Sequence, residues 1–124
     1  MKINRSWLHD SSTDSYPDSV LIFGNLPFSI ATPLTLQLIK DFSLRSNPES
    51  LFHGIKQAQM VLMYQEEVAR KLTAKVGTSM YGRLGVMAQT FCKSVDYIEK
   101  IHAHKFIPKP KVDAGIVKFN LDFE

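Results

Sequence analysis

The chain has 124 residues, which is the size of one domain or of part of one. Hydrophobic residues make up 44% of it and charged residues 22%, a composition that excludes a disordered or collagen-like protein. The formal net charge of +3 suits a polyanionic partner such as nucleic acid, although many soluble domains are equally basic. Cys92 is the only cysteine, and no apolar run approaches the roughly 20 residues that cross a bilayer. We therefore expect no disulfide partner and no membrane span, and we interpret Cys92 as a small buried hydrophobic residue.

Residues 1–18 are polar, and we expect them to form a lead-in to a folded part that spans residues 19–124. The apolar run 20–23 ends at Gly24. Its length, its composition and the glycine that ends it predict a strand buried on both faces, as in a parallel sheet.

Thr32 followed by Pro33 predicts the start of the first helix. A threonine hydroxyl can cap a helix, and proline is tolerated at the first helical position. The helix is expected over residues 33–43, where four apolar residues recur at helical spacing: Leu34, Leu38, Ile39 and Phe42.

The rest of the chain continues the alternation of strands and helices. The pattern predicts strands over residues 59–64, 94–102 and 114–121 and helices over residues 65–72 and 83–92. It predicts loops over residues 43–56 and 77–82. Such an order is typical of a layered α/β fold, and the closing pair of strands indicates one antiparallel strand.

The most informative residues follow the first predicted strand. Ligands of open α/β sheets bind at the carboxyl ends of the strands, and here that end continues into Asn25-Leu26-Pro27-Phe28. The Asn25 side chain offers a carbonyl oxygen and an amide group, Pro27 stiffens the backbone, and Phe28 offers a flat ring on which a base can stack.

This corner suits the binding of an exocyclic amine such as adenine N6. The Asn25 side-chain oxygen and the Leu26 carbonyl can accept hydrogen bonds from its two hydrogens, which aims the nitrogen lone pair at an electrophilic methyl group. The same residues can also form a plain connecting loop, and the downstream sequence decides between the two interpretations.

Four stretches together resemble one known family. They are GNLPFSIATPL at residues 24–34, YQEEVARKL at 64–72, YGRLGVMAQ at 81–89 and FIPKPKVD at 106–113. From Val20 to Leu121 the chain resembles the rRNA adenine N6,N6-dimethyltransferases, and it is most similar to the mitochondrial branch related to mitochondrial transcription factor B. The resemblance implies part of a Rossmann-like methyltransferase domain, S-adenosyl-L-methionine as the methyl donor, and hairpin adenines of small-subunit rRNA as the target.

The resemblance also implies roles for individual residues. Residues 25–28 would form the catalytic base site, with Asn25 also near the donor. Phe106 would close over the other face of the target adenine.

Three residues of the same proline-rich loop, Pro108, Pro110 and Lys111, match the family's positioning loop. Arg83 matches a recurrent family position that we interpret as RNA contact or loop support. Phe28 stands where the family often has Tyr, so that stacking is kept and a hydroxyl is lost.

The family's glycine-rich donor loop lies upstream of the asparagine motif, whereas no glycine precedes Gly24 here. We therefore expect the donor-binding half and the C-terminal helical lobe to be absent, and the chain alone to be inactive and marginally stable or self-associating. The resemblance implies a mitochondrial location, with the cytoplasm or nucleus as alternatives because residues 1–18 contain acids and form no clear transit peptide.

His102 and His104 share one face of a predicted strand, but no cysteine or acid cluster completes a site. We predict an exposed or RNA-facing pair and no metal. Six lysines between Lys93 and Lys118 are as consistent with a solvated face as with phosphate contacts.

Two rival functions remain. One is a non-catalytic nucleic-acid-binding or mitochondrial transcription-accessory protein that kept the base-site loop. The other is a DNA adenine methyltransferase, which is disfavoured because that relative usually has two prolines after its Asp or Asn, whereas Leu26 here precedes the single Pro27.

Overall fold

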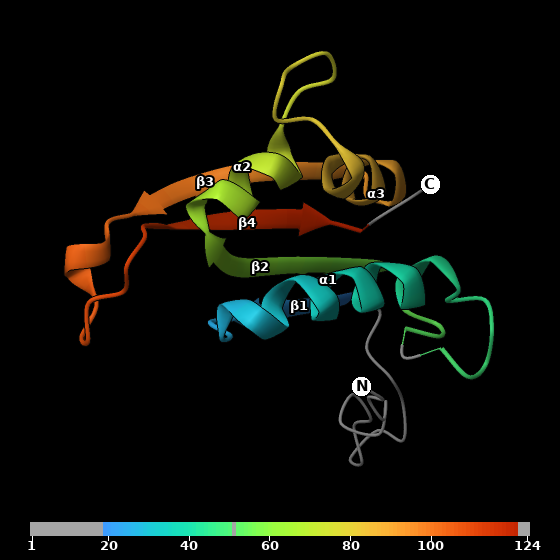
Figure 1. Ribbon diagram of the computed structural model, residues 1–124. Coiled ribbons are helices and arrows are strands. Elements are labelled where there is room, and N and C mark those ends of the chain that lie inside the picture. The colour runs from blue at the N-terminus through green and yellow to red at the C-terminus, as the bar shows by residue number, and fades with distance from the viewer. Residues whose placement is uncertain (1–18, 51, 122–124) are drawn as a thin grey trace.

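The computed structural model describes residues 19–50 and 52–121, so the expected lead-in at residues 1–18 lies outside the described part. The elements follow the predicted order (Figure 1): β1 (Ser19–Gly24), α1 (Phe28–Ser43), β2 (Gln57–Gln65), α2 (Glu66–Thr73), α3 (Arg83–Phe91), β3 (Ser94–Ile101), a short 3₁₀ turn η2 (Ala103–Lys105) and β4 (Ala114–Asn120). No helix among the described residues is long and apolar enough to span a membrane.

The four strands form one mixed sheet in the order β1-β2-β4-β3. β1 and β2 are parallel, and their register runs from Ser19 opposite Gln57 to Gly24 opposite Leu62. β4 lies between β2 and β3 and is antiparallel to both. The predicted α/β sheet with one antiparallel strand is therefore confirmed, with that strand inserted inside the sheet.

One face of the sheet forms the hydrophobic core. Alternate residues of β2 are fully buried on this face, and α1, α2 and α3 pack over it (Figure 1). The core joins all three helices to the two central strands: it includes Leu38, Phe42, Met60, Leu62, Tyr64, Leu72, Ala88, Val117 and Phe119.

The prediction that β1 is buried on both faces is wrong. Leu21 is 52% exposed and Phe23 is 71% exposed, because both project from the face opposite the helices. Within the described residues β1 also forms an outer edge of the sheet, since it pairs only with β2. An apolar run alone cannot distinguish a two-sided strand from a strand with one open face.

Helix α1 begins at Phe28, five residues before the predicted start at Pro33. Pro27 precedes the helix, and its carbonyl accepts hydrogen bonds from the backbone N–H groups of Ile30 and Ala31 at 2.9 and 3.1 Å. Pro33 lies inside the helix, where its missing N–H removes only the bond to the Ser29 carbonyl near the exposed first turn. Thr32 makes no capping bond.

A buried hydroxyl pair joins α1 to β2. The Thr35 hydroxyl donates to the Ala31 carbonyl at 2.6 Å, so its oxygen accepts the hydrogen of the Tyr64 hydroxyl, which lies 2.5 Å away. Both side chains are about 1% exposed, and burial raises the pKa of Tyr64 well above its ordinary value. The pair attaches the middle of α1 to the central strand β2.

Thr35→Val removes the acceptor while keeping the side-chain shape, and we expect it to destabilise the protein by about 1–3 kcal/mol, because the Tyr64 hydroxyl is left buried without a partner. Chemical denaturation measures the loss. Thr90→Val, at an exposed position of α3, is the matched control and should change stability by less than about 0.5 kcal/mol. Equal effects of the two substitutions would contradict this assignment.

Candidate functional site

The corner at residues 25–28 connects β1 to α1 at the carboxyl edge of the two parallel strands. Asn25 is exposed, and within the described residues its side chain has no hydrogen-bond partner. The Pro27 carbonyl is used by the first turn of α1, whereas the Leu26 carbonyl accepts no backbone hydrogen bond from the described residues. An amide side chain and a backbone carbonyl are therefore both available to a ligand at this edge.

The corner is packed tightly against the sheet at Gly24. A Cβ atom at this position would lie 2.6 Å from Leu62 Cδ2 and 3.5 Å from Leu26 Cγ. Leu62 is buried, so its side chain has little room to move aside. Glycine at position 24 thus allows the backbone that enters the corner to lie directly on the core.

The second predicted site segment, the 102–113 loop, lies at the same edge of the sheet. β3 ends at Ile101 opposite Ala114, and Ala114 is also opposite Gln65 at the end of β2. The loop extends beyond the sheet on the side where α1 begins (Figure 1). Phe106 is half-buried in it, whereas Ile107 is 99% exposed.

Several other predicted residues of the loop are also exposed. They include Pro108, which follows a cis peptide bond, and Lys111, whereas Pro110 is half-buried. Arg83 is exposed at the first residue of α3, and no hydrogen bond or ion pair joins it to the corner or the loop within the described residues. The structure thus places the two motifs at the same end of the sheet, with no hydrogen bond or ion pair between them among the described residues, and leaves Arg83 apart from both.

Polar contacts converge on Asp113, the residue that precedes β4. Its Oδ1 accepts the backbone N–H of Ala103 at 2.8 Å, and its backbone carbonyl accepts the N–H of Glu66 at 2.9 Å. Its Oδ2 lies 3.5 Å from Lys100 Nζ and 3.8 Å from His102 Nδ1.

The ion pairs continue into α2. Lys100 Nζ lies 3.3 Å from Glu66 Oε2. Glu66 Oε1 accepts a hydrogen bond from Arg70 Nε at 2.8 Å and lies 2.7 Å from Arg70 Nη2. We call these five side chains the Asp113 network: Glu66, Arg70, Lys100, His102 and Asp113. This network was not predicted from the sequence, although the Asp that ends the motif at 106–113 was a signal for it.

Two members of the network have pKa values shifted in favour of their charged forms. The hydrogen bond from Ala103, followed by the charge of Lys100, lowers the pKa of Asp113. The hydrogen bond and charge of Glu66 raise the pKa of Lys100, with a smaller contribution from Asp113. Asp113 is therefore ionised and Lys100 protonated throughout the physiological range.

The remaining candidate residues are less informative. The rings of His102 and His104 stack with centroids 5.6 Å apart, and both residues are exposed. No group of three or more His, Cys, Asp or Glu able to hold a metal occurs in the described part of the chain. Cys92 is 4% exposed, as predicted for a buried residue, and burial raises the pKa of its thiol to about 12, so it is not a nucleophile.

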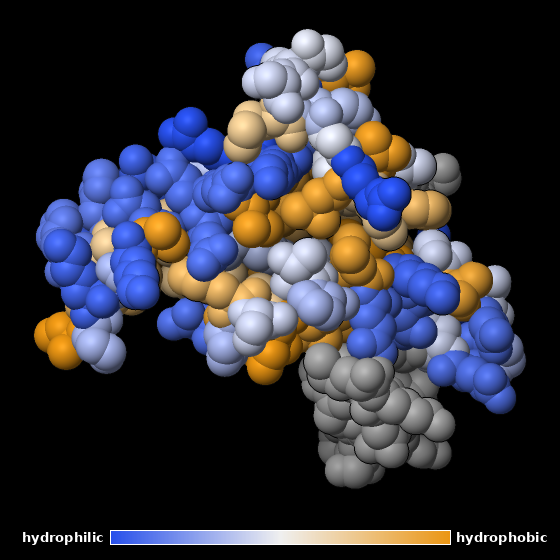
Figure 2. Space-filling view, viewed as in Figure 1, coloured by the Kyte–Doolittle hydropathy of each residue, from blue (hydrophilic) through white to orange (hydrophobic). Residues whose placement is uncertain are grey.

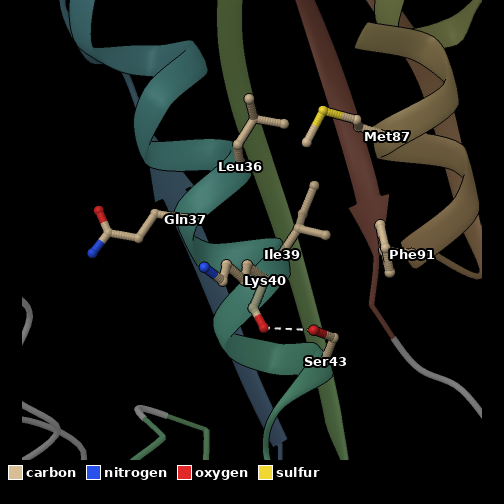
Figure 3. Close-up of a pocket in the computed structure, with 7 residues that line it drawn as sticks. All are labelled: Leu36, Gln37, Ile39, Lys40, Ser43, Met87 and Phe91. Carbon is tan, nitrogen blue, oxygen red and sulfur yellow. Dashed lines mark hydrogen bonds between the residues drawn. The ribbon is translucent and has the colours of Figure 1, made fainter. Parts of the chain in front are cut away.

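An apolar groove of about 540 Å³ lies between α1 and α3. Figure 3 shows Leu36 and Ile39 of α1 facing Met87 and Phe91 of α3 across it, and Figure 2 shows hydrophobic surface between these helices. Because the groove follows the C-terminal half of α1, it lies away from the edge of the sheet where the two motifs are placed.

Comparison with known proteins identifies the class. The pattern of the ribosomal RNA adenine dimethylase family matches residues 4–122, and the chain belongs to that family. A human relative, the mitochondrial dimethyladenosine transferase 1, is 41% identical over 117 residues, which are 94% of this chain and 31% of that protein. The ribosomal RNA small subunit methyltransferase A of Shewanella oneidensis is 42% identical over 97 residues, which are 78% of this chain and 31% of that one.

A crystal structure of a dimethyladenosine transferase from Plasmodium falciparum has a similar fold. The TM-score is 0.63 at 33% identity, and the match covers 89% of this chain and 35% of that one. The fold therefore matches part of a Rossmann-like methyltransferase sheet, as predicted. The chain spans about a third of the length of the relatives it matches.

We expect Gly24→Ala to destabilise the protein by about 1–3 kcal/mol, because the added Cβ displaces Leu62 from the core. Thermal unfolding measures the loss. Gly82→Ala is the matched control: a Cβ atom at position 82 would have no neighbour within 4 Å and the backbone there is extended, so the melting temperature should be unchanged. A Gly24→Ala variant as stable as the parent would show that Leu62 repacks freely.

The hydrogen bond from the Ala103 amide to the Asp113 carboxylate should weaken only at acidic pH, where the carboxylate becomes protonated. Because the pKa of Asp113 is lower in the folded chain, its contribution is complete above the ordinary carboxyl range and is lost as the pH falls below about 4. The amide proton shift of Ala103, followed by NMR, should show this low-pH step. Asp113→Asn should abolish the step, and a step that survives in this variant would assign it to another group.

Proposed function

We propose that this chain supplies the target-base side of an S-adenosyl-L-methionine-dependent rRNA adenine N6,N6-dimethyltransferase. The observation that supports it most directly is the corner at residues 25–28, where an amide and a carbonyl without partners among the described residues lie at the carboxyl edge of the sheet. Membership of the family makes adenine N6 of rRNA the substrate that this corner would bind.

The corner holds the reacting amine by two acceptors. Asn25 Oδ1 and the Leu26 carbonyl oxygen each accept one hydrogen of the amino group, which turns the nitrogen lone pair away from the purine ring. No strong base is needed, because the nitrogen becomes acidic only as its new bond forms. Positioning and electrostatics account for the rate enhancement.

Two aromatic rings stabilise the extruded base. Phe28, on the first residue of α1, is half-buried and stacks on one face of the adenine, and Phe106 from the 102–113 loop closes on the other face. Stacking contributes roughly 1–3 kcal/mol per base and offsets the cost of removing the base from its helix. Pro108 and Pro110 limit the conformations of the loop that brings Phe106 to the base.

When bound, the donor supplies a methyl group on a positively charged sulfur. Asn25 is the residue of this chain that would contact it, since it lies at the carboxyl end of β1. The 124 residues contain no glycine before Gly24 from which a glycine-rich donor-binding loop could form. The proposal therefore includes weak donor binding and no turnover by these 124 residues alone.

The RNA backbone would bind the exposed lysines around Phe106. Lys105, Lys109 and Lys111 are exposed on the 102–113 loop, and none of them has an ion pair with the described residues. We assign them, with Arg83 as a more distant cation, to phosphates of a small-subunit rRNA hairpin. The mitochondrial relatives support a location in the mitochondrion.

A second candidate function rests on the same lysines. A chain that keeps the base corner and the basic loop but binds no donor would act as a non-catalytic RNA-binding or transcription-accessory protein. It would bind hairpin RNA with the same salt dependence and transfer no methyl group.

The test measures methyl transfer from S-adenosyl-L-methionine to a small-subunit rRNA hairpin by the natural full-length polypeptide that contains these residues. We expect Asn25→Ala to lower kcat by about 100-fold or more while RNA affinity changes little, because a donor–acceptor contact of the transition state is lost. Asn47→Ala, in the exposed connection after α1, is the matched control and should keep full activity.

Two outcomes would overturn the proposal. Equal activity of the Asn25→Ala variant and the parent would exclude the corner as the catalytic site. Salt-sensitive hairpin binding with no methyl transfer by the parent would favour the accessory function.

A further inference from the structure

We propose that Asp113 is a positioning residue that holds Phe106 in place for the target base, acting through the backbone of Ala103. The inference rests on the proposed function, which assigns Phe106 to the base, and it adds the part of the chain that orders the 102–113 loop.

Asp113 connects the two ends of this loop. Its Oδ1 accepts the N–H of Ala103, ten residues earlier in the chain, at 2.8 Å. Its backbone carbonyl accepts the N–H of Glu66, the first residue of α2, at 2.9 Å. The same residue thus closes the loop and attaches it to the helix that follows β2.

The contact at Ala103 leads directly to Phe106. The carbonyl of Ala103 accepts the N–H of Phe106 at 3.1 Å, and the carbonyl of His102 accepts the N–H of Lys105 at 3.0 Å, which together form the η2 turn. The N–H of Ala103 therefore donates to Asp113, and the carbonyl of Ala103 accepts the N–H of Phe106. Two successive hydrogen bonds connect the carboxylate to the aromatic residue.

Within the described residues, these hydrogen bonds at residues 102–106 are the main contacts that order the loop. Residues 107–112 make no backbone hydrogen bond there, and Ile107 is almost fully exposed. Ala103, in contrast, is buried. A loop with so few contacts depends on its ends for its position.

The surrounding charges fix the orientation of the Asp113 carboxylate. Lys100 lies between Asp113 and Glu66, at 3.5 and 3.3 Å, and Arg70 holds Glu66 from the next turn of α2. Exposed ion pairs of this kind add little stability one by one. Their effect here is geometric, because they leave Oδ1 directed at the Ala103 amide.

The experiment follows the loop and the reaction separately. Hydrogen exchange by NMR reports the Ala103 and Phe106 amides, and methyl transfer and binding of a small-subunit rRNA hairpin report function in the natural full-length polypeptide. Asp113→Ala is compared with Asp96→Ala, which removes an exposed carboxylate from the part of β3 opposite Lys118, far from the loop.

We expect Asp113→Ala to speed exchange of the Ala103 and Phe106 amides by about tenfold or more, while the amides of Val117 and Phe119 in β4 stay protected, which shows that the sheet is intact. Methyl transfer should lose about tenfold in kcat with hairpin affinity nearly unchanged. Asp113→Asn keeps an oxygen acceptor for Ala103 and should recover part of both effects. Asp96→Ala should change neither.

A double-mutant cycle with Phe106→Ala shows whether Asp113 acts through Phe106. If it does, Asp113→Ala causes no further loss of kcat in the Phe106→Ala background; additive losses would assign Asp113 to general stability and overturn the proposal. Unchanged exchange at Ala103 would also overturn it. If the parent binds the hairpin but transfers no methyl group, the proposed function has failed and this role fails with it, while the exchange data still report whether Asp113 orders the loop.

Discussion

The arrangement of the site depends on the insertion of β4 between β2 and β3. Because β4 runs antiparallel to both neighbours, it begins at the edge where the parallel strands β1 and β2 end. The connection from β3 to β4 therefore lies at the same end of the sheet as the corner that follows β1, with β2 between that corner and β4. Two segments about 80 residues apart in sequence, residues 25–28 and Phe106, reach one end of the sheet by this pairing alone.

The sheet is asymmetric, and this affects how the corner is held. All three helices cover one face, and the Thr35–Tyr64 hydroxyl pair and the core around Leu62 fix α1 on that side. On the other face Leu21 and Phe23 are exposed. The corner is therefore stabilised on the face that the helices cover, where Gly24 packs against Leu62 and α1 packs against the core.

Much of the fold could be predicted from the sequence, because apolar periodicity and glycine stops mark element type and order without any tertiary information. The family motifs supplied both segments of the proposed site, whose roles stay predictions. The start of α1 was missed because Thr32-Pro33 is a good capping pattern, while the actual helix begins where the Pro27 carbonyl meets two free N–H groups. The exposed face of β1 and the burial of Phe52 and Ile55 in the predicted loop 43–56 depend on what packs against them, which no local pattern contains. The Asp113 network was missed for the same reason, since it joins α2, β3 and the residue before β4.

The distribution of charge fits a site for a neutral base on a charged polymer. The corner offers an amide oxygen, a backbone carbonyl and an aromatic ring, none of which carries a charge. Glu66, Arg70, Lys100 and Asp113 form ion pairs with one another, so they change the local potential little beyond the network. Lys105, Lys109 and Lys111 have no ion-pair partners among the described residues, and they lie close to Phe106 in the sequence. In the proposed function, attraction of phosphates and recognition of the base would fall to different residues, so that no cation of the loop is placed against the amine that acts as the nucleophile.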